Sequence, residues 1–140
     1  MAIIDADTHV DEWEETWAGL EGTAFEKYIP VTALLPEVES KRAGYNASNR
    51  RCWIVEGRVQ SRAVRDEVNH PPRVFRELVD VPGRVAHMDQ LGVDVQVIFP
   101  TFFIRYNTSN EDAELALTTA YNRWLAEKCA AANGQVGRAH

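Results

Sequence analysis

The amino-acid sequence predicts an α/β fold built on parallel strands, and three of its segments carry that prediction. Residues 2–5 form a short apolar run that ends abruptly in acidic residues. Such a run is typical of a buried parallel strand whose C-terminal end opens onto a site. A second apolar run at residues 93–99 follows a helical pattern at 85–91 and precedes another that begins near 109. Because strands and helices alternate along the chain, we expect a parallel sheet or barrel.

The stretch between residues 10 and 80 is irregular and is interrupted by prolines. Within it, residues 52–60 contain an apolar strand pattern, a turn at Gly57 and a short return strand, which predicts a β-hairpin. A loop this long inside a compact domain usually carries function or covers a site. We therefore expect a long functional insertion that contains one hairpin.

The second half of the chain is more regular. The helix at residues 85–91 is expected to end at Gly92, and the strand that follows to end at Pro100. Ser109, with Asp112 three residues later, resembles a capping box that starts the next helix. The apolar stripe of that helix comprises Ala113, Leu117, Ala120, Tyr121, Trp124 and Leu125.

The sequence stops at residues 137–140, where a third parallel strand would be due, so we expect two core strands. Two strands do not complete a parallel sheet, and a closed (β/α)8 barrel needs about 250 residues. We therefore expect residues 1–140 to form one incomplete domain, either a fragment of a barrel or a subunit whose sheet another chain completes.

The composition is that of a soluble globular protein, with 45% hydrophobic and 26% charged residues. A formal net charge of −6 argues against nucleic-acid binding, which normally uses a basic surface. No apolar stretch approaches the ~20 residues of a membrane span, and the N-terminal apolar run is too short for a signal peptide. Cys52 and Cys129 are widely separated and are expected to be reduced thiols. These features predict a cytoplasmic protein that binds neither nucleic acid nor membrane.

The densest chemistry of the chain lies at Asp5, Asp7 and His9. In an extended segment these three side chains point to one side, because strand side chains alternate. Carboxylate oxygen and imidazole nitrogen both bind divalent metals, and an open coordination position lets a bound water ionise near neutral pH. From the spacing alone two interpretations stay open, a polar strand end whose aspartates cap a turn and a divalent metal site, and the spacing does not favour the metal site.

Four segments, taken in order along the chain, are similar to the amidohydrolase-related family, which includes the aminocarboxymuconate-semialdehyde decarboxylase-like enzymes. They are IIDADTHV at residues 3–10 with Glu12 after it, NRRCWIVEGR at 49–58, RVAHMDQLGVDVQVIFPT at 84–101 and AYNRWL at 120–125. The resemblance implies the N-terminal part of a TIM-like (β/α)8 barrel, with a long insertion after the first strand that contains the hairpin.

The resemblance also implies a metal centre. The family's His-x-His pair falls on Asp7 and His9, so that a carboxylate replaces the first histidine. Asp5, Glu12 and Thr101 fall on supporting or pocket positions. Zn²⁺ is the expected metal, with Mn²⁺ or Fe²⁺ as alternatives because a carboxylate oxygen suits harder ions. The family's remaining ligands come from later strands, so we expect little or no turnover from these residues alone.

Three functions follow as expectations. The first is a metal-dependent hydrolase or non-oxidative decarboxylase of a small carboxylated or cyclic substrate. The second is a haloacid-dehalogenase-like phosphatase, in which Asp5 is the nucleophile, Asp7 the acid/base and Mg²⁺ the cofactor. The third is a non-catalytic truncated product, or a subunit that pairs with another chain. Assembly into a homo-oligomer is compatible with each of them.

Overall fold

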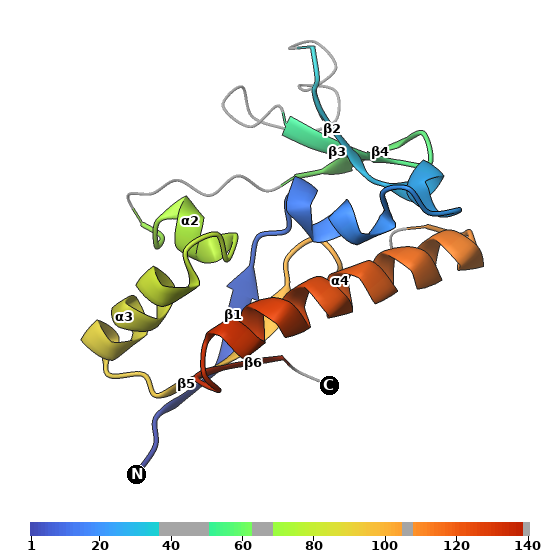
Figure 1. Cartoon of the computed structure of the whole chain (residues 1–140). Helices are drawn as coiled ribbons and strands as arrows, with labels where there is room; N and C mark the ends of the chain where they lie inside the picture. The colour runs from blue at the N-terminus through green and yellow to red at the C-terminus, as the bar shows by residue number, and fades with distance from the viewer. Residues whose placement is uncertain (37–50, 63–68, 105–107, 139–140) are drawn as a thin grey trace.

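The computed structural model of the chain describes residues 1–36, 51–62, 69–104 and 108–138 (Figure 1). These residues form two sheets of three strands each. The parallel sheet has the order β1-β5-β6, with bounds Ile4–Val10, Val95–Pro100 and Val136–Arg138. The antiparallel sheet has the order β2-β3-β4, with bounds Val31–Leu34, Arg51–Val55 and Arg58–Ser61. The predicted mixed α/β fold is confirmed, and the described part of the chain forms no closed barrel.

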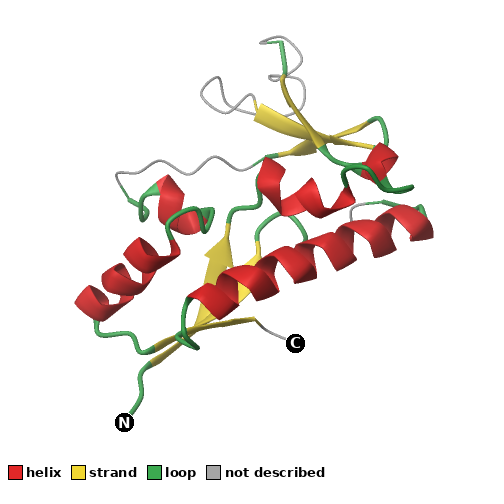
Figure 2. Cartoon of the chain, in the orientation of Figure 1, coloured by secondary structure: helices red, strands yellow, loops and turns green. Residues whose placement is uncertain are grey.

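Helices connect the parallel strands and separate the two sheets (Figure 2). The α-helices are α2, α3 and α4, with bounds Arg73–Arg76, Val81–Leu91 and Glu111–Ala131, and the 3-10 helices are η1 and η2, with bounds Glu14–Leu20 and Glu26–Tyr28. Helix α3 connects β1 to β5, and α4 connects β5 to β6. In Figure 1, η1 lies between α4 and the antiparallel sheet.

Strand β1 differs from the prediction in extent and in burial. It begins at Ile4 and continues through the polar residues to Val10, whereas we expected a buried strand at residues 2–5. Ile3 and Ile4 are 55% and 58% exposed, and β1 lies at an edge of the parallel sheet, paired with β5 alone among the described strands. The acidic residues therefore belong to the strand itself, and the core contact of β1 is Val10, which is fully buried.

The third parallel strand, which the sequence did not predict, is present. Strand β6 pairs with β5 through Val136–Gln96 and Gly137–Val97 contacts. It is only three residues long, and its single buried apolar residue, Val136, lies between Gln135 and Gly137. A pattern this short carries no detectable strand periodicity.

The helix boundaries follow from their caps. Helix α3 starts four residues earlier than expected because the side chain of Asp80 accepts a hydrogen bond from the backbone N–H of Gly83 at 2.8 Å. It ends as predicted at Gly92, which has a left-handed φ of 69°. Helix α4 is capped by Asn110, not by Ser109 as we expected, since the Asn110 side chain accepts from the N–H groups of residues 112 and 113.

The predicted hairpin is confirmed, and it gains β2 as a third strand. Its turn places Glu56 at φ 47° and Gly57 at φ 73°, a pair of left-handed residues that is typical of a type I′ turn. The Glu56 carboxylate accepts hydrogen bonds from the Thr108 hydroxyl and from Asn110 Nδ2. The hairpin turn is thereby tied to the N-terminus of α4. Asn49 and Arg50, which belong to the hairpin segment of the family resemblance, lie outside the described residues.

One apolar core joins the two sheets. All six residues of the predicted α4 stripe are buried, together with Val10, Ile98 and Val136 from the parallel sheet. The Trp17 ring of η1 packs edge-on against Trp53 of the hairpin, with ring centroids 6.3 Å apart. Cys52 is buried and Cys129 is half-buried, and both are free thiols. No helix within the described ranges is long and apolar enough to span a membrane.

Candidate functional site

The predicted pair Asp7 and His9 lies in the C-terminal half of β1. The two side chains approach each other, with His9 Nε2 3.6 Å from Asp7 Oδ1. The His9 side chain is 23% exposed and the Asp7 side chain is 90% exposed. The pair is therefore accessible from solvent while the imidazole is held by its neighbours, which include the Phe99 ring at a centroid distance of 6.2 Å.

The hydrogen bonding of His9 fixes the tautomer of its ring. Nδ1 lies 3.0 Å from the carbonyl oxygen of Pro100, at the end of the adjacent strand. A carbonyl oxygen only accepts, so Nδ1 carries the proton and donates it. In the neutral imidazole the lone pair then resides on Nε2, the atom that faces Asp7. Histidines that bind metals typically donate their second ring N–H to a backbone carbonyl or carboxylate in this way.

The contact between His9 Nε2 and Asp7 Oδ1 brings two acceptors together when the ring is neutral. Such a contact becomes favourable when a proton, a bridging water molecule or a cation lies between the two atoms. Two ligands bound tetrahedrally to one Zn²⁺ at 2.0–2.2 Å are separated by about 3.4 Å. The observed separation of 3.6 Å is close to that value, so the Asp7 and His9 donors fit a shared divalent ion.

Asp5 does not share a side of the sheet with this pair, contrary to our expectation. The register of β1 against β5 shifts between Asp5 and Thr8, where three steps along β1 match two steps along β5. This extra residue is a β-bulge, and it reverses which side chains share a face. Asp5 and Thr8 now lie on the same side, and the Thr8 hydroxyl donates to Asp5 Oδ2. His9 pairs with Phe99 on the opposite side.

The Asp5 carboxylate accepts three hydrogen bonds. Besides the Thr8 hydroxyl, it accepts the backbone N–H of Asp7 at 3.2 Å and the side-chain amide of Gln96 at 3.3 Å. These bonds, with that from Thr8 as the largest contribution, lower the pKa of Asp5 below its ordinary value. The oxygens of Asp5 are therefore engaged by neighbours on β1 and β5, and its role as a supporting group stays a prediction.

Glu12 is buried, with 3% of its surface exposed. Its carboxylate accepts the backbone N–H groups of Thr101, Phe102 and Phe103 at 2.9–3.1 Å. Burial raises the pKa of Glu12 in spite of these bonds. Through these hydrogen bonds Glu12 connects the segment after β1 to the loop after β5, and we call this contact the Glu12 clamp.

Thr101 lies at the same junction, next to Asp11. The Thr101 hydroxyl is 3.4 Å from Asp11 Oδ1, and Asp11 Oδ2 is 2.5 Å from Arg76 Nη1. Arg76 and Asp11 are largely buried, with 6% and 13% of their side chains exposed. The sequence did not identify this ion pair, because its two members are 65 positions apart and neither belongs to a recognisable motif.

A second group that the sequence did not identify connects α3 to β1. Arg84 is buried, and its Nε donates to Gln96 Oε1 at 3.0 Å while its Nη1 donates to the Phe75 carbonyl at 3.1 Å. Burial lowers the pKa of Arg84 to about 10. Gln96 in turn donates to Asp5. The pattern of residues 84–96 indicated a helix and a strand, and it carried no signal for this polar contact between them.

Within the ranges that the structure describes, no three His, Cys, Asp or Glu side chains gather as a metal site. Asp7 and His9 supply two donors, whereas zinc sites in proteins usually have three or four protein ligands. Two donors alone do not make a zinc site of that kind, and a metal at this pair would need further donors.

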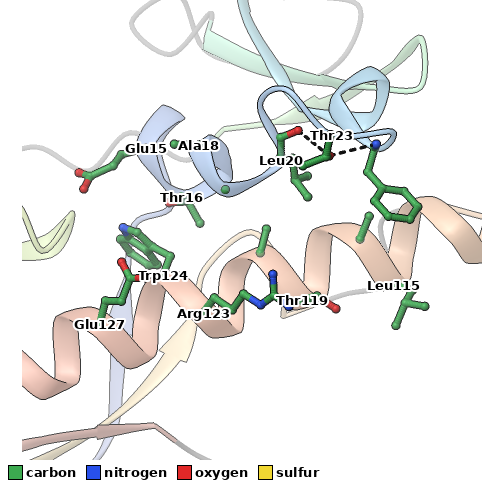
Figure 3. A pocket seen from close by; sticks show the side chains of 14 residues that line it. Glu15, Thr16, Ala18, Leu20, Thr23, Leu115, Thr119, Arg123, Trp124 and Glu127 are labelled. Atoms are coloured by element: carbon green, nitrogen blue, oxygen red, sulfur yellow. Dashed lines mark hydrogen bonds between the residues drawn. The ribbon is translucent and has the colours of Figure 1, made fainter.

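A groove of about 640 Å³ lies between η1 and α4 (Figure 3). Its walls are mainly apolar and include Leu20, Phe25 and Leu115, with the exposed charged residues Arg123 and Glu127 on α4. Neither Asp7 nor His9 lines this groove. The candidate metal corner and the groove are therefore separate features of the molecule.

No protein-family model matches this chain, and no curated protein matches it significantly. The likeness to the amidohydrolase-related family consequently rests on the four sequence segments alone, and the function that it implies is treated as a proposal.

Proposed function

We propose that Asp7 and His9 form one corner of the metal centre of an amidohydrolase-family enzyme. The enzyme would hydrolyse or non-oxidatively decarboxylate a small carboxylated or cyclic substrate. The observation that carries the proposal is the orientation of the His9 ring. Its Nδ1 is committed to the Pro100 carbonyl at 3.0 Å, and its Nε2 is directed at Asp7 Oδ1 at 3.6 Å.

This orientation supports a cation at the pair for an electrostatic reason. The Pro100 carbonyl fixes the proton on Nδ1, so the neutral ring presents a lone pair to a carboxylate that is itself an acceptor. A divalent ion accepts both lone pairs at once. The contact can also be satisfied by a water molecule that donates to both atoms, or by protonation of Nε2, and neither of these leaves a role for a metal.

The residues have distinct roles in this proposal. His9 supplies a nitrogen donor whose direction is fixed by Pro100, and Asp7 supplies a negatively charged oxygen donor that is exposed enough to receive an ion. Zn²⁺ bound here would supply Lewis acidity and a water that ionises near neutral pH. Mn²⁺ and Fe²⁺ are alternatives because one donor is a carboxylate. With two donors, these residues would bind the ion more weakly than a complete centre would.

The phosphatase alternative needs Asp5 and Asp7 to act on one substrate. In the structure the Asp5 carboxylate is occupied by Thr8, Gln96 and the Asp7 N–H group. The bulge in β1 also places Asp5 on the side of the sheet opposite to His9. No contact of the described residues favours this alternative.

The test is a calorimetric titration of the whole chain with Zn²⁺, repeated with Co²⁺ while the visible absorption of the ion is followed. We expect the wild type to bind one ion and the Asp7→Ala/His9→Ala variant to lose that binding. The ¹⁵N resonance of His9 Nε2 should move when Zn²⁺ is added, because a ligand nitrogen changes its electronic environment directly.

Helix α3 offers a matched control. His87 is half-buried and Asp89 is exposed, the same combination as His9 and Asp7. They are also two positions apart, but on a helix residues with that spacing do not face each other. The His87→Ala/Asp89→Ala variant should therefore bind Zn²⁺ as the wild type does. Absence of binding by the wild type, or equal binding by both double variants, would refute the proposal.

A further inference from the structure

The bulge in β1 determines where Asp7 and His9 point. In a regular strand Asp5, Asp7 and His9 would share one side. The additional residue between Asp5 and Thr8 turns His9 to the other side, where its ring meets Phe99. Whatever stabilises the bulge therefore sets the direction of the pair.

Asp5 accepts two hydrogen bonds that span the bulge. One of its oxygens accepts the N–H of Asp7, and the other accepts the hydroxyl of Thr8. Both bonds connect Asp5, which precedes the irregularity, with residues two or three positions further along β1. If the Asp5 carboxylate rotated away, the Asp7 N–H would lose the acceptor that holds it in this conformation.

The orientation of Asp5 is in turn fixed from α3. Gln96 accepts a hydrogen bond from Arg84 Nε at 3.0 Å through Oε1 and donates one to Asp5 Oδ2 at 3.3 Å through Nε2. Arg84 is 6% exposed and is also anchored to the Phe75 carbonyl. Because Arg84 only donates, the amide of Gln96 has a single orientation, with its NH₂ group toward Asp5.

We propose that Arg84, Gln96 and Asp5 form a positioning relay that holds the β1 bulge and so directs Asp7 and His9 toward a shared ion. The relay does not contact the ion, and its effect on metal binding rests on the proposed function. Its effect on the bulge does not, because the three hydrogen bonds are made by the protein alone. Gln96 is its key member, since it must accept from one partner and donate to the other.

A variant of Gln96 that can accept from Arg84 but cannot donate to Asp5 tests the relay. Gln96→Glu keeps the size of the side chain and strengthens the contact with Arg84, because a carboxylate accepts from a guanidinium. It cannot donate to Asp5 and instead faces it with a second negative charge. Gln135→Glu is the matched control. Gln135 is half-buried like Gln96, and its Nε2 donates to an aspartate, Asp89, at 3.4 Å.

Two measurements on the full chain separate the relay from the metal. The first is hydrogen exchange at the Asp7 amide in metal-free protein. It should be at least about fivefold faster in Gln96→Glu than in Gln135→Glu, the factor expected for one ordinary hydrogen bond. The second is the Zn²⁺ dissociation constant, which should rise about tenfold in Gln96→Glu alone, as found when the group that orients a metal ligand is lost.

The outcomes are distinct. Unchanged exchange at Asp7 overturns the relay, and so does faster exchange with unchanged Zn²⁺ affinity. If the wild type binds no Zn²⁺, the proposed function fails and the metal role of the relay fails with it, while Asp7 exchange still reports whether the relay holds the bulge. If Gln96→Glu does not fold, Thr8→Val removes a different hydrogen bond to Asp5 and should change both measurements in the same direction.

Discussion

Replacing Glu12 by glutamine tests the clamp between the two strand ends. The Glu12 carboxylate accepts three consecutive backbone N–H groups and is 3% exposed. Near pH 4 the raised pKa favours the protonated carboxyl, which can turn its O–H away and still present both oxygens to the loop. A glutamine of the same shape keeps one acceptor oxygen and turns an NH₂ group, which cannot accept, toward the remaining donors. At least one backbone N–H then loses its partner in a partly buried loop. We expect Glu12→Gln to lower the free energy of unfolding by about 2 kcal/mol near pH 4.

The loss of unfolding free energy caused by Glu12→Gln should become smaller as the pH rises. Burial raises the pKa of Glu12 in the folded protein above the ordinary value of 4.5. The folded state then binds the proton more tightly than the unfolded state, so this contribution to stability is complete below the unfolded pKa. It is lost as the pH rises through the folded pKa, with a slope of at most about 1.4 kcal/mol per pH unit. Glutamine does not titrate, and the advantage of the wild type over Glu12→Gln should therefore shrink above pH 4.5.

Urea unfolding followed by tryptophan fluorescence at several pH values between 4 and 8 measures this difference. Glu127→Gln removes an exposed carboxylate and serves as the control, for which the difference from the wild type should stay within about 0.5 kcal/mol. An advantage of the wild type over Glu12→Gln that grows with pH would refute the reasoning. It would mean that the three backbone hydrogen bonds lower the pKa of Glu12 by more than its burial raises it.

Two further predictions concern contacts that hold the candidate site in place. Arg76→Met leaves the carboxylate of Asp11 largely buried without its ion-pair partner at 2.5 Å, and we expect a loss of about 3 kcal/mol in urea unfolding. Adding Asp11→Asn should recover part of that loss, and purely additive effects would contradict the pairing. Asn110→Ala removes the cap of α4 and should cost about 1 kcal/mol in the same assay. Ser109→Ala should cost much less, and the reverse order would restore Ser109 as the cap.

The regular elements were predictable because each has a local signal of sufficient length. The α4 stripe repeats at helical spacing over four turns, and Gly92 supplies the left-handed residue that ends α3. Strand β6 has three residues and one buried side chain, so no period is visible. Asn110 and Ser109 are both good capping residues, and Asn110 also contacts Glu56, 54 positions away, which no local pattern announces.

The candidate site was predictable as a set of residue types but not as an arrangement. The alternation rule put Asp5, Asp7 and His9 on one side, and it failed because β1 contains an extra residue that no local pattern announces. The residues that fix this irregularity, Gln96 and Arg84, lie on other elements. Sequence periodicity describes a strand in isolation, whereas a bulge is a property of two strands in register.

The bulge also constrains what could complete the proposed metal centre. Because it turns His9 to the side of the sheet where Phe99 lies, further donors must approach from that side and not from the side of α3. Asp5 is excluded as a third ligand for the same reason, although it is only two residues from Asp7. Val97 shares the His9 side with Phe99, since alternate residues of β5 point the same way. A metal centre built on Asp7 and His9 would therefore draw its remaining ligands from chain that faces Val97 and Phe99, the side opposite to Arg84.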